Sequence, residues 1–136
     1  MDIDMVELEM ARESGLELQF WGQCRTQWRD DDLMPEWQLE INGHKVDFVF
    51  LDCRLMIEIM GGVTDGRSRG DHVRRKGYIR DRRYAIWAQM NGWAIFELTD
   101  EQLNDETGIL SVALYRDAYQ EKTRRKPGEN TCHYIQ

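Results

Sequence analysis

Two carboxylic acids, Asp47 and Glu58, lie eleven residues apart in a stretch that alternates between apolar and other residues. A period of two is typical of a β-strand with one buried face, so the stretch predicts a β-hairpin. If its turn is Asp52-Cys53, Asp47 lies directly opposite Glu58. Side chains that face each other on antiparallel strands have Cβ atoms about 4.5–5.5 Å apart. Two carboxylates that close repel each other, which indicates a shared proton or a bound cation.

The two faces of this hairpin differ in composition. The face expected to be buried is apolar and comprises Val46, Phe48, Phe50, Leu55, Ile57 and Ile59. The other is mixed and comprises Lys45, Asp47, Val49, Leu51, Arg54, Met56, Glu58 and Met60. A shift of one residue would bury both acids, so the pattern should fix the register. The simpler alternative is two solvated acids on the open face of a sheet.

The elements that must position these acids follow from periodicity and turn residues. In order, the chain predicts a helix over residues 16–28, a strand over 36–41, the hairpin strands, a helix over 78–90, a strand over 93–98 and a helix over 109–120. Ser14 is a candidate cap, and Asn42-Gly43 is a strong hairpin signal. Residues 61–77 form a loop rich in glycine and arginine. The fold class is therefore an α/β (α+β) domain with one small mixed sheet flanked by helices.

Length and composition bound the function. At 136 residues the chain is one domain, expected over residues 1–121, with a basic and then polar tail over 122–136. No run of about 18 apolar residues is present, and the acidic N-terminus lacks a signal-peptide pattern. The three cysteines have neither zinc-site nor disulfide-framework spacing, which favours a reducing cytoplasm.

Charge is distributed unevenly. The net charge is −7, and residues 1–40 hold eleven acids against three bases. Residues 67–83, in contrast, hold eight bases against two acids. A local basic segment can neutralise phosphates even on an acidic protein, although a solvated charged surface is the simpler interpretation. The acidic region also suits a basic protein partner.

Several of these segments, taken in order, resemble the PD-(D/E)XK nuclease superfamily, and in particular its very-short-patch-repair-endonuclease-like branch and small phage proteins of that type. The segments are Val46-Asp47-Phe48, Ile57-Glu58-Ile59-Met60-Gly61-Gly62, His72, Lys76-Gly77-Tyr78 with Asp81 and Arg83-Tyr84, and Asn91-Gly92-Trp93, with Leu16–Phe20 as the opening helix. The likeness covers roughly residues 16–103 and implies a restriction-endonuclease-like core.

The resemblance implies a phosphodiesterase that uses Mg²⁺ or Mn²⁺. Asp47, Glu58 and the backbone carbonyl of Ile59 would bind the ion, and Glu17 could steer a metal-bound water, unless it only complements the helix dipole. His72 would be a general base or a phosphate contact, or else a surface residue. The implied contacts to nucleic-acid phosphates are Arg67, Arg69, Arg74, Arg75, Lys76, Arg80 and Arg83.

One position departs from the pattern. Met60 stands where a lysine or a third acid is expected, and a thioether neither accepts a proton at neutral pH nor binds Mg²⁺ well. In the assumed register Lys45 lies opposite Met60 and could supply the missing cation. This hypothesis predicts that Lys45→Met abolishes cleavage but leaves folding and DNA binding intact.

The resemblance therefore implies a cytoplasmic, Mg²⁺-dependent endonuclease of phage or mobile-element type that acts on duplex, nicked or branched DNA. Cutting both strands of one site would require two active sites, so a homodimer is plausible. The alternative is a protein of the same fold that has lost catalysis. It would bind nucleic acid or, through the acidic N-terminal region, a host protein such as a defence complex. Neither function involves a membrane.

Overall fold

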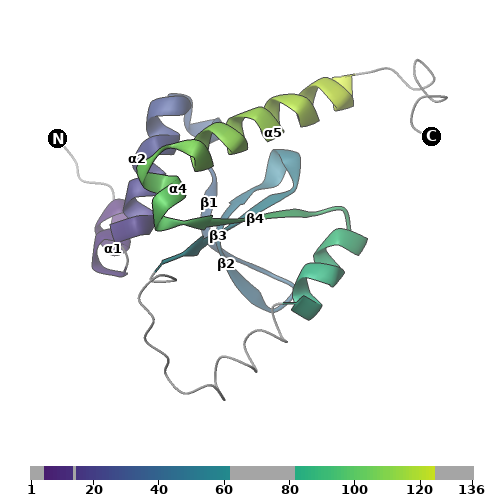
Figure 1. The fold of residues 1–136 in the computed structure, drawn as a ribbon, viewed down its shortest axis with the longest axis horizontal. Coiled ribbons are helices and arrows are strands. Elements are labelled where there is room, and N and C mark those ends of the chain that lie inside the picture. Colours follow the sequence, from purple (N-terminus) through teal and green to yellow (C-terminus); the bar gives the residue numbers. More distant parts are fainter. Residues whose placement is uncertain (1–4, 14, 62–81, 125–136) are drawn as a thin grey trace.

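A four-stranded sheet forms the centre of the molecule (Figure 1). The computed structural model describes residues 5–13, 15–61 and 82–124. The strands are β1 (Glu36–Ile41), β2 (His44–Phe50), β3 (Leu55–Met60) and β4 (Ala94–Thr99), and they lie in the order β1-β2-β3-β4. The first two pairings are antiparallel, whereas β3 and β4 are parallel. The sheet is therefore mixed, as the sequence predicted.

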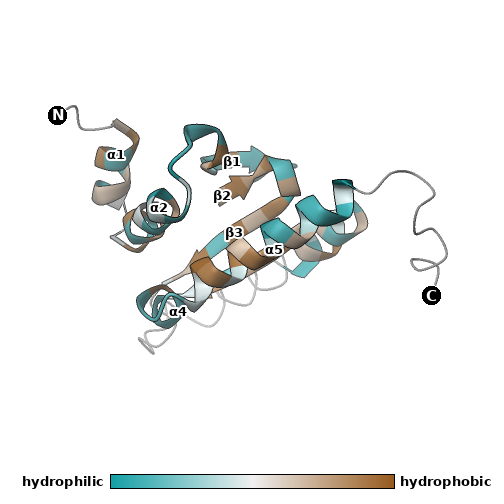
Figure 2. Ribbon diagram, turned by 90° about the horizontal axis from the view of Figure 1, so that it is seen from above, coloured by the Kyte–Doolittle hydropathy of each residue, from teal (hydrophilic) through white to brown (hydrophobic). Residues whose placement is uncertain are grey.

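Helices cover both faces of the sheet. One face carries α1 (Met5–Glu13), α2 (Gly15–Gln27), α4 (Asp100–Asn104) and α5 (Thr107–Arg124). The helix that includes residues 82–90 packs on the other face. Figure 2 shows that β3, between these layers, is hydrophobic over most of its length. No helix in the described part of the chain is long and apolar enough to cross a membrane.

Two hydrophobic clusters correspond to the two faces. The larger cluster joins residues of α2, α4 and α5 to the sheet, and it includes Phe20, Cys24, Phe48, Phe50, Leu55, Ile57, Leu103, Ile109 and Val112. The smaller cluster lies under the 82–90 helix and is centred on Val46, Val49, Met56 and Ala88. Burial of apolar surface on both sides explains why β3 is apolar at nearly every position.

Most of the predicted elements are confirmed, and two helices were missed. The predicted 16–28, 36–41 and 93–98 segments correspond to α2, β1 and β4, and α5 extends the predicted last helix in both directions. The sequence predicted neither α1 nor α4. The start of α4 is a capping box in which Thr99 and Gln102 exchange side-chain and backbone hydrogen bonds. Ser14, the 61–77 loop except for Gly61, and residues 125–136 of the tail lie outside the described residues.

The first hairpin follows its turn signal. Asn42 and Gly43 both have positive φ, 51° and 80°, as a tight two-residue hairpin turn requires. The flanking pairs, Ile41 with His44 and Glu40 with Lys45, continue to Glu36 with Val49. The turn thus places His44 and Lys45 at the start of β2, a few residues before Asp47.

The register of the second hairpin is confirmed, but its turn is longer than predicted. The pairs Phe48–Ile57, Val49–Met56 and Phe50–Leu55 belong to the predicted register. Instead of two residues, the connection is a 3₁₀ turn, η2 (Leu51–Cys53), followed by Arg54 in the left-handed region. Arg54 donates to the carbonyl of Asn91 at 2.7 Å, which ties this turn to the start of β4.

The alternation of side chains does not continue through Asp47, which corrects the predicted face. Val46 was expected beside Phe48, yet it packs in the opposite cluster with Val49. On β1 the same change separates Trp37 from Leu39. Between those two residues Gln38 has a φ of 55°, and a left-handed residue in a strand reverses the faces of the residues that follow. In the part of the first hairpin nearest its turn, side chains therefore point to the opposite faces of the sheet from those that uninterrupted alternation predicts.

Candidate active site

Asp47 lies where the orientation of β2 changes. Its carboxylate accepts a hydrogen bond from the backbone amide of Ile59 at 2.8 Å. Burial raises the pKa of Asp47 above its ordinary value, while the Ile59 amide, the nearby His44 and a hydrogen bond with the Glu58 side chain oppose the rise. Asp47 is therefore held by a fixed backbone donor, the amide of the residue that follows Glu58.

Glu58 has a partner that the sequence did not reveal. His44 Nε2 lies 2.9 Å from Glu58 Oε1, and the two side chains are 32% and 23% exposed. An ionised carboxylate can only accept, so Nε2 of His44 carries the proton in that state. The His44 ring packs on Tyr84, with 4.5 Å between centroids, and the Tyr84 hydroxyl donates to the carbonyl of Ile41. This support fixes the direction from which His44 approaches Glu58.

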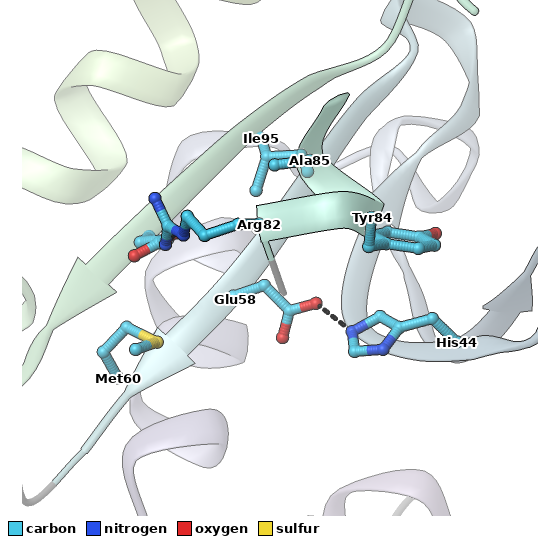
Figure 3. A pocket seen from close by; sticks show the side chains of 8 residues that line it. His44, Glu58, Met60, Arg82, Tyr84, Ala85 and Ile95 are labelled. Atoms are coloured by element: carbon cyan, nitrogen blue, oxygen red, sulfur yellow. Dashed lines mark hydrogen bonds and ion pairs between the residues drawn. The ribbon is translucent and has the colours of Figure 1, made fainter. Parts of the chain in front are cut away.

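A cavity of about 90 Å³ opens beside this pair (Figure 3). Among the described residues its lining comprises His44, Glu58, Met60, Arg82, Tyr84, Ala85, Ile95 and Glu97. Arg82 reaches in from the 82–90 helix and pairs with Glu97 of β4 at 3.2 Å. Glu97 is the cross-strand neighbour of Glu58 in the parallel pairing. The cavity is thus lined by two adjacent glutamates. Glu58 is paired with His44, and Glu97 is paired with Arg82.

The reversal of the hairpin tip decides which residue faces this cavity. With uninterrupted alternation, Lys45 would share a face with Glu58 and Met60, and His44 would lie on the other face. In the structure, the pairs of β2 with β3 end at Phe48–Ile57, Lys45 is exposed, and His44 lines the cavity. The expected position of Lys45 opposite Met60 is therefore wrong. Its role in catalysis stays a prediction.

Glu17 is buried in the first turn of α2, with 7% of its surface exposed. Its Oε1 accepts a hydrogen bond from the indole nitrogen of Trp37 at 3.1 Å. Trp37 pairs with Phe48, the residue after Asp47. Glu17 therefore lies on the face of the sheet that α2 covers, near Asp47 along the chain of β2. Because Glu17 is buried and hydrogen-bonded, it is not a surface acid that serves only to complement the helix dipole. Its proposed role toward a metal-bound water is not tested by this contact.

The predicted phosphate contacts fall mostly outside the described residues. These are His72, Arg67, Arg69, Arg74, Arg75, Lys76 and Arg80. Arg83 is described and is exposed on the 82–90 helix. Its neighbour Arg82, which the sequence did not single out, is the one that lines the cavity.

Nucleophilic thiol chemistry does not fit the two described cysteines. Cys24 and Cys53 are both fully buried. Burial raises the pKa of Cys53 to about 12 and that of Cys24 further still, so both remain thiols at neutral pH. The two described cysteines are therefore not part of the candidate site.

Comparison with known proteins identifies the fold. No protein-family profile matches the chain, and no curated protein matches its sequence. Among solved structures the chain is similar to the "Homing Endonuclease I-Bth0305I Catalytic Domain", with a TM-score of 0.59 and 16% sequence identity. The likeness covers 78% of this chain and 97% of that one. The chain therefore has a nuclease fold, as the resemblance in its sequence implied.

Proposed function

We propose that this protein is a metal-dependent DNA endonuclease of the PD-(D/E)XK type. The observation that carries the proposal is the 2.8 Å hydrogen bond from the Ile59 amide to the Asp47 carboxylate, which brings Asp47 next to Glu58 on the adjacent strand of a nuclease fold. Two neighbouring carboxylates, one of them with a raised pKa, are a recognised mark of functional sites. The same fold can support many activities, so the proposed chemistry is inferred from these two carboxylates and not from the fold.

The donor set suits a hard divalent cation. Asp47 and Glu58 offer carboxylate oxygens, and the carbonyl of Ile59 is a further oxygen donor on the same strand as Glu58. Among the described residues, no group of three or more His, Cys, Asp or Glu side chains is arranged to hold a metal. The proposed ion would therefore rely on the two carboxylates, a backbone carbonyl and retained water, as Mg²⁺ commonly does. When bound, it would polarise a phosphoryl oxygen and acidify an attacking water.

The chain's own residues prepare this site for the ion. The Ile59 amide fixes one oxygen of Asp47, and His44 fixes one oxygen of Glu58. Burial makes the charged form of Asp47 costly, and a bound cation would offset that cost. The acids are thus oriented before the ion arrives, which limits the reorganisation needed for catalysis.

The proposed substrate is DNA, in duplex, nicked or branched form. The basic segment over residues 67–83 would contact its phosphates and position it without reading its sequence. A homodimer would allow both strands of one site to be cut. A phage origin and a cytoplasmic location remain parts of this proposal.

A second function is favoured by one observation, the thioether of Met60 in the lining of the cavity. If no other group replaces the missing lysine or acid, the protein binds nucleic acid, or a host protein through its acidic N-terminal region, without cutting. A nicking assay with Mg²⁺ or Mn²⁺ on duplex, single-stranded and branched DNA separates the two functions. Cleavage by the wild type that is lost in Asp47→Ala supports the enzyme, and binding without cleavage supports the alternative.

A further inference from the structure

Two glutamates lie side by side at the cavity. Glu58 of β3 and Glu97 of β4 are paired residues of parallel strands, and both line the cavity. Like charges on neighbouring strands repel, and each is offset here by a different partner. His44 contacts Glu58 (Figure 3), and Arg82 contacts Glu97 at 3.2 Å.

The two pairs differ in how readily they can be exchanged. Arg82 and Glu97 are 50% and 46% exposed, so water screens their attraction and the pair contributes little to stability. His44 and Glu58 are less exposed, and the ring of His44 is held against Tyr84. An incoming anion would therefore displace Glu97 from Arg82 more easily than it would displace Glu58 from His44.

Arg82 also has the chemistry that the site otherwise lacks. Among the described residues that line the cavity with Glu58 and Met60, Arg82 is the one with a permanent positive charge. Its planar guanidinium presents paired donors that match the oxygens of a phosphate. A phosphodiester that enters here would be repelled by Glu97, which is not among the proposed metal ligands, and Arg82 would offset that repulsion.

We propose that Arg82 is the phosphate-binding cation of this site, and that it exchanges Glu97 for the phosphate held next to Glu58. This role replaces the side chain missing at Met60, and it is assigned to Arg82 in place of Lys45. The inference rests on the proposed nuclease function and deepens it. Glu97 would hold the guanidinium in place while the site is empty.

Two measurements test the proposal with the full-length protein. DNA affinity is measured over a range of salt concentrations in EDTA, and the single-turnover cleavage rate is measured with Mg²⁺ at saturating protein. We expect Arg82→Ala to weaken binding, to reduce the salt slope by about one phosphate contact, and to lower the saturated rate roughly 100-fold. Arg82→Lys should recover only part of the rate, because it keeps the charge and loses the paired donors.

Two further variants complete the test. Arg12→Ala removes an exposed arginine of α1, on the other face of the sheet, and should leave the saturated rate within about threefold of the wild type. Glu97→Gln should bind DNA more tightly than the wild type, because Arg82 then loses its competing anion.

The outcomes separate this inference from the function on which it rests. If the wild type cleaves and Arg82→Ala cleaves equally fast at saturation, the role of Arg82 is overturned and the nuclease function stands. If the wild type binds without cleaving, the affinity measurements decide. Weaker binding by Arg82→Ala together with tighter binding by Glu97→Gln supports the exchange, and no change in either overturns it. If the wild type does not bind DNA, both proposals are overturned.

Discussion

The carboxylate of Asp47 accepts a hydrogen bond from the backbone amide of Ile59, with 2.8 Å between Oδ2 and N. The last backbone pair of β2 with β3 is Phe48–Ile57. Beyond that pair, the Asp47 side chain links the two strands through its hydrogen bond with the Ile59 amide. Asp47 therefore has two functions in the proposed account. It holds the end of β3 to β2, and it presents its carboxylate beside Glu58.

Removing the hydrogen-bond acceptor at Asp47 should destabilise the fold. Asp47→Ala leaves the half-buried Ile59 amide without this partner, so we expect the free energy of unfolding to fall by about 1 kcal/mol. Asp47→Asn keeps an acceptor oxygen and should lose less. Urea denaturation of the two variants checks this difference. Equal losses would show that the Ile59 contact does not stabilise the protein.

The raised pKa of Asp47 predicts a pH-dependent difference between the wild type and Asp47→Asn. A folded state with the raised pKa binds the proton more tightly than the unfolded chain, so the stability that this provides is present below the ordinary value of 3.8. That stability is lost as the pH rises through the folded-state pKa. In EDTA, Asp47→Asn should therefore gain stability relative to the wild type as the pH rises above the ordinary pKa of 3.8.

The same comparison has a metal control. Mg²⁺ added at neutral pH should raise the melting temperature of the wild type more than that of Asp47→Asn, because the ion binds the folded site. A difference in stability that stays constant with pH would contradict the burial of Asp47 as the cause. If Mg²⁺ stabilised both proteins equally, the ion would not bind at Asp47.

His44 should control how well Glu58 binds a cation. We expect His44→Ala to lower Mn²⁺ affinity about tenfold, since groups that orient a carboxylate ligand commonly have effects of this size. His44→Gln can place an amide donor near the position of Nε2 and should recover part of the affinity. Isothermal titration calorimetry with Mn²⁺ measures both variants. Tyr84→Phe keeps the ring against His44 and is the control for the packing alone.

The turn between β2 and β3 should matter for stability and not for catalysis. Arg116 of α5 is buried, and it donates to Asp52 Oδ2 at 2.9 Å and 2.7 Å and also to the carbonyl of Leu33. Its guanidinium lies 4.9 Å from the ring centroid of Trp28. Asp52→Asn removes the negative partner of a buried cation and should cost about 1.5–3 kcal/mol of unfolding free energy. Cleavage at low temperature should be unchanged.

Much of the fold could be predicted because its signals are local. Asn42-Gly43 determined one turn, and alternation gave the register of Phe48 with Ile57. The capping box of Thr99 and Gln102 was also a local signal, so α4 could have been found. The first helix, α1, carries no comparable cap among its described residues. The placement of Met10 in the core depends on tertiary packing against α2.

The site was predicted only in part, because its geometry depends on two non-local features. The left-handed Gln38 turns the hairpin tip over, which brings His44 to the cavity and removes Lys45 from it. No residue type marks that change, since glutamine is not favoured at positive φ. The pairing of Glu58 with Glu97 joins strands that are far apart in sequence. Periodicity within one strand says nothing about its parallel neighbour.

The most direct test of the proposed function is the nicking of supercoiled DNA in the presence of Mg²⁺, with wild type and Asp47→Asn purified in the same way. Asp47→Asn is the sharper control, because it preserves an acceptor for the Ile59 amide and removes the charge that a cation needs. The account predicts that the wild type nicks the DNA, that EDTA abolishes nicking, and that Asp47→Asn is inactive while folded. Nicking by folded Asp47→Asn at the wild-type rate would contradict the assignment of this site.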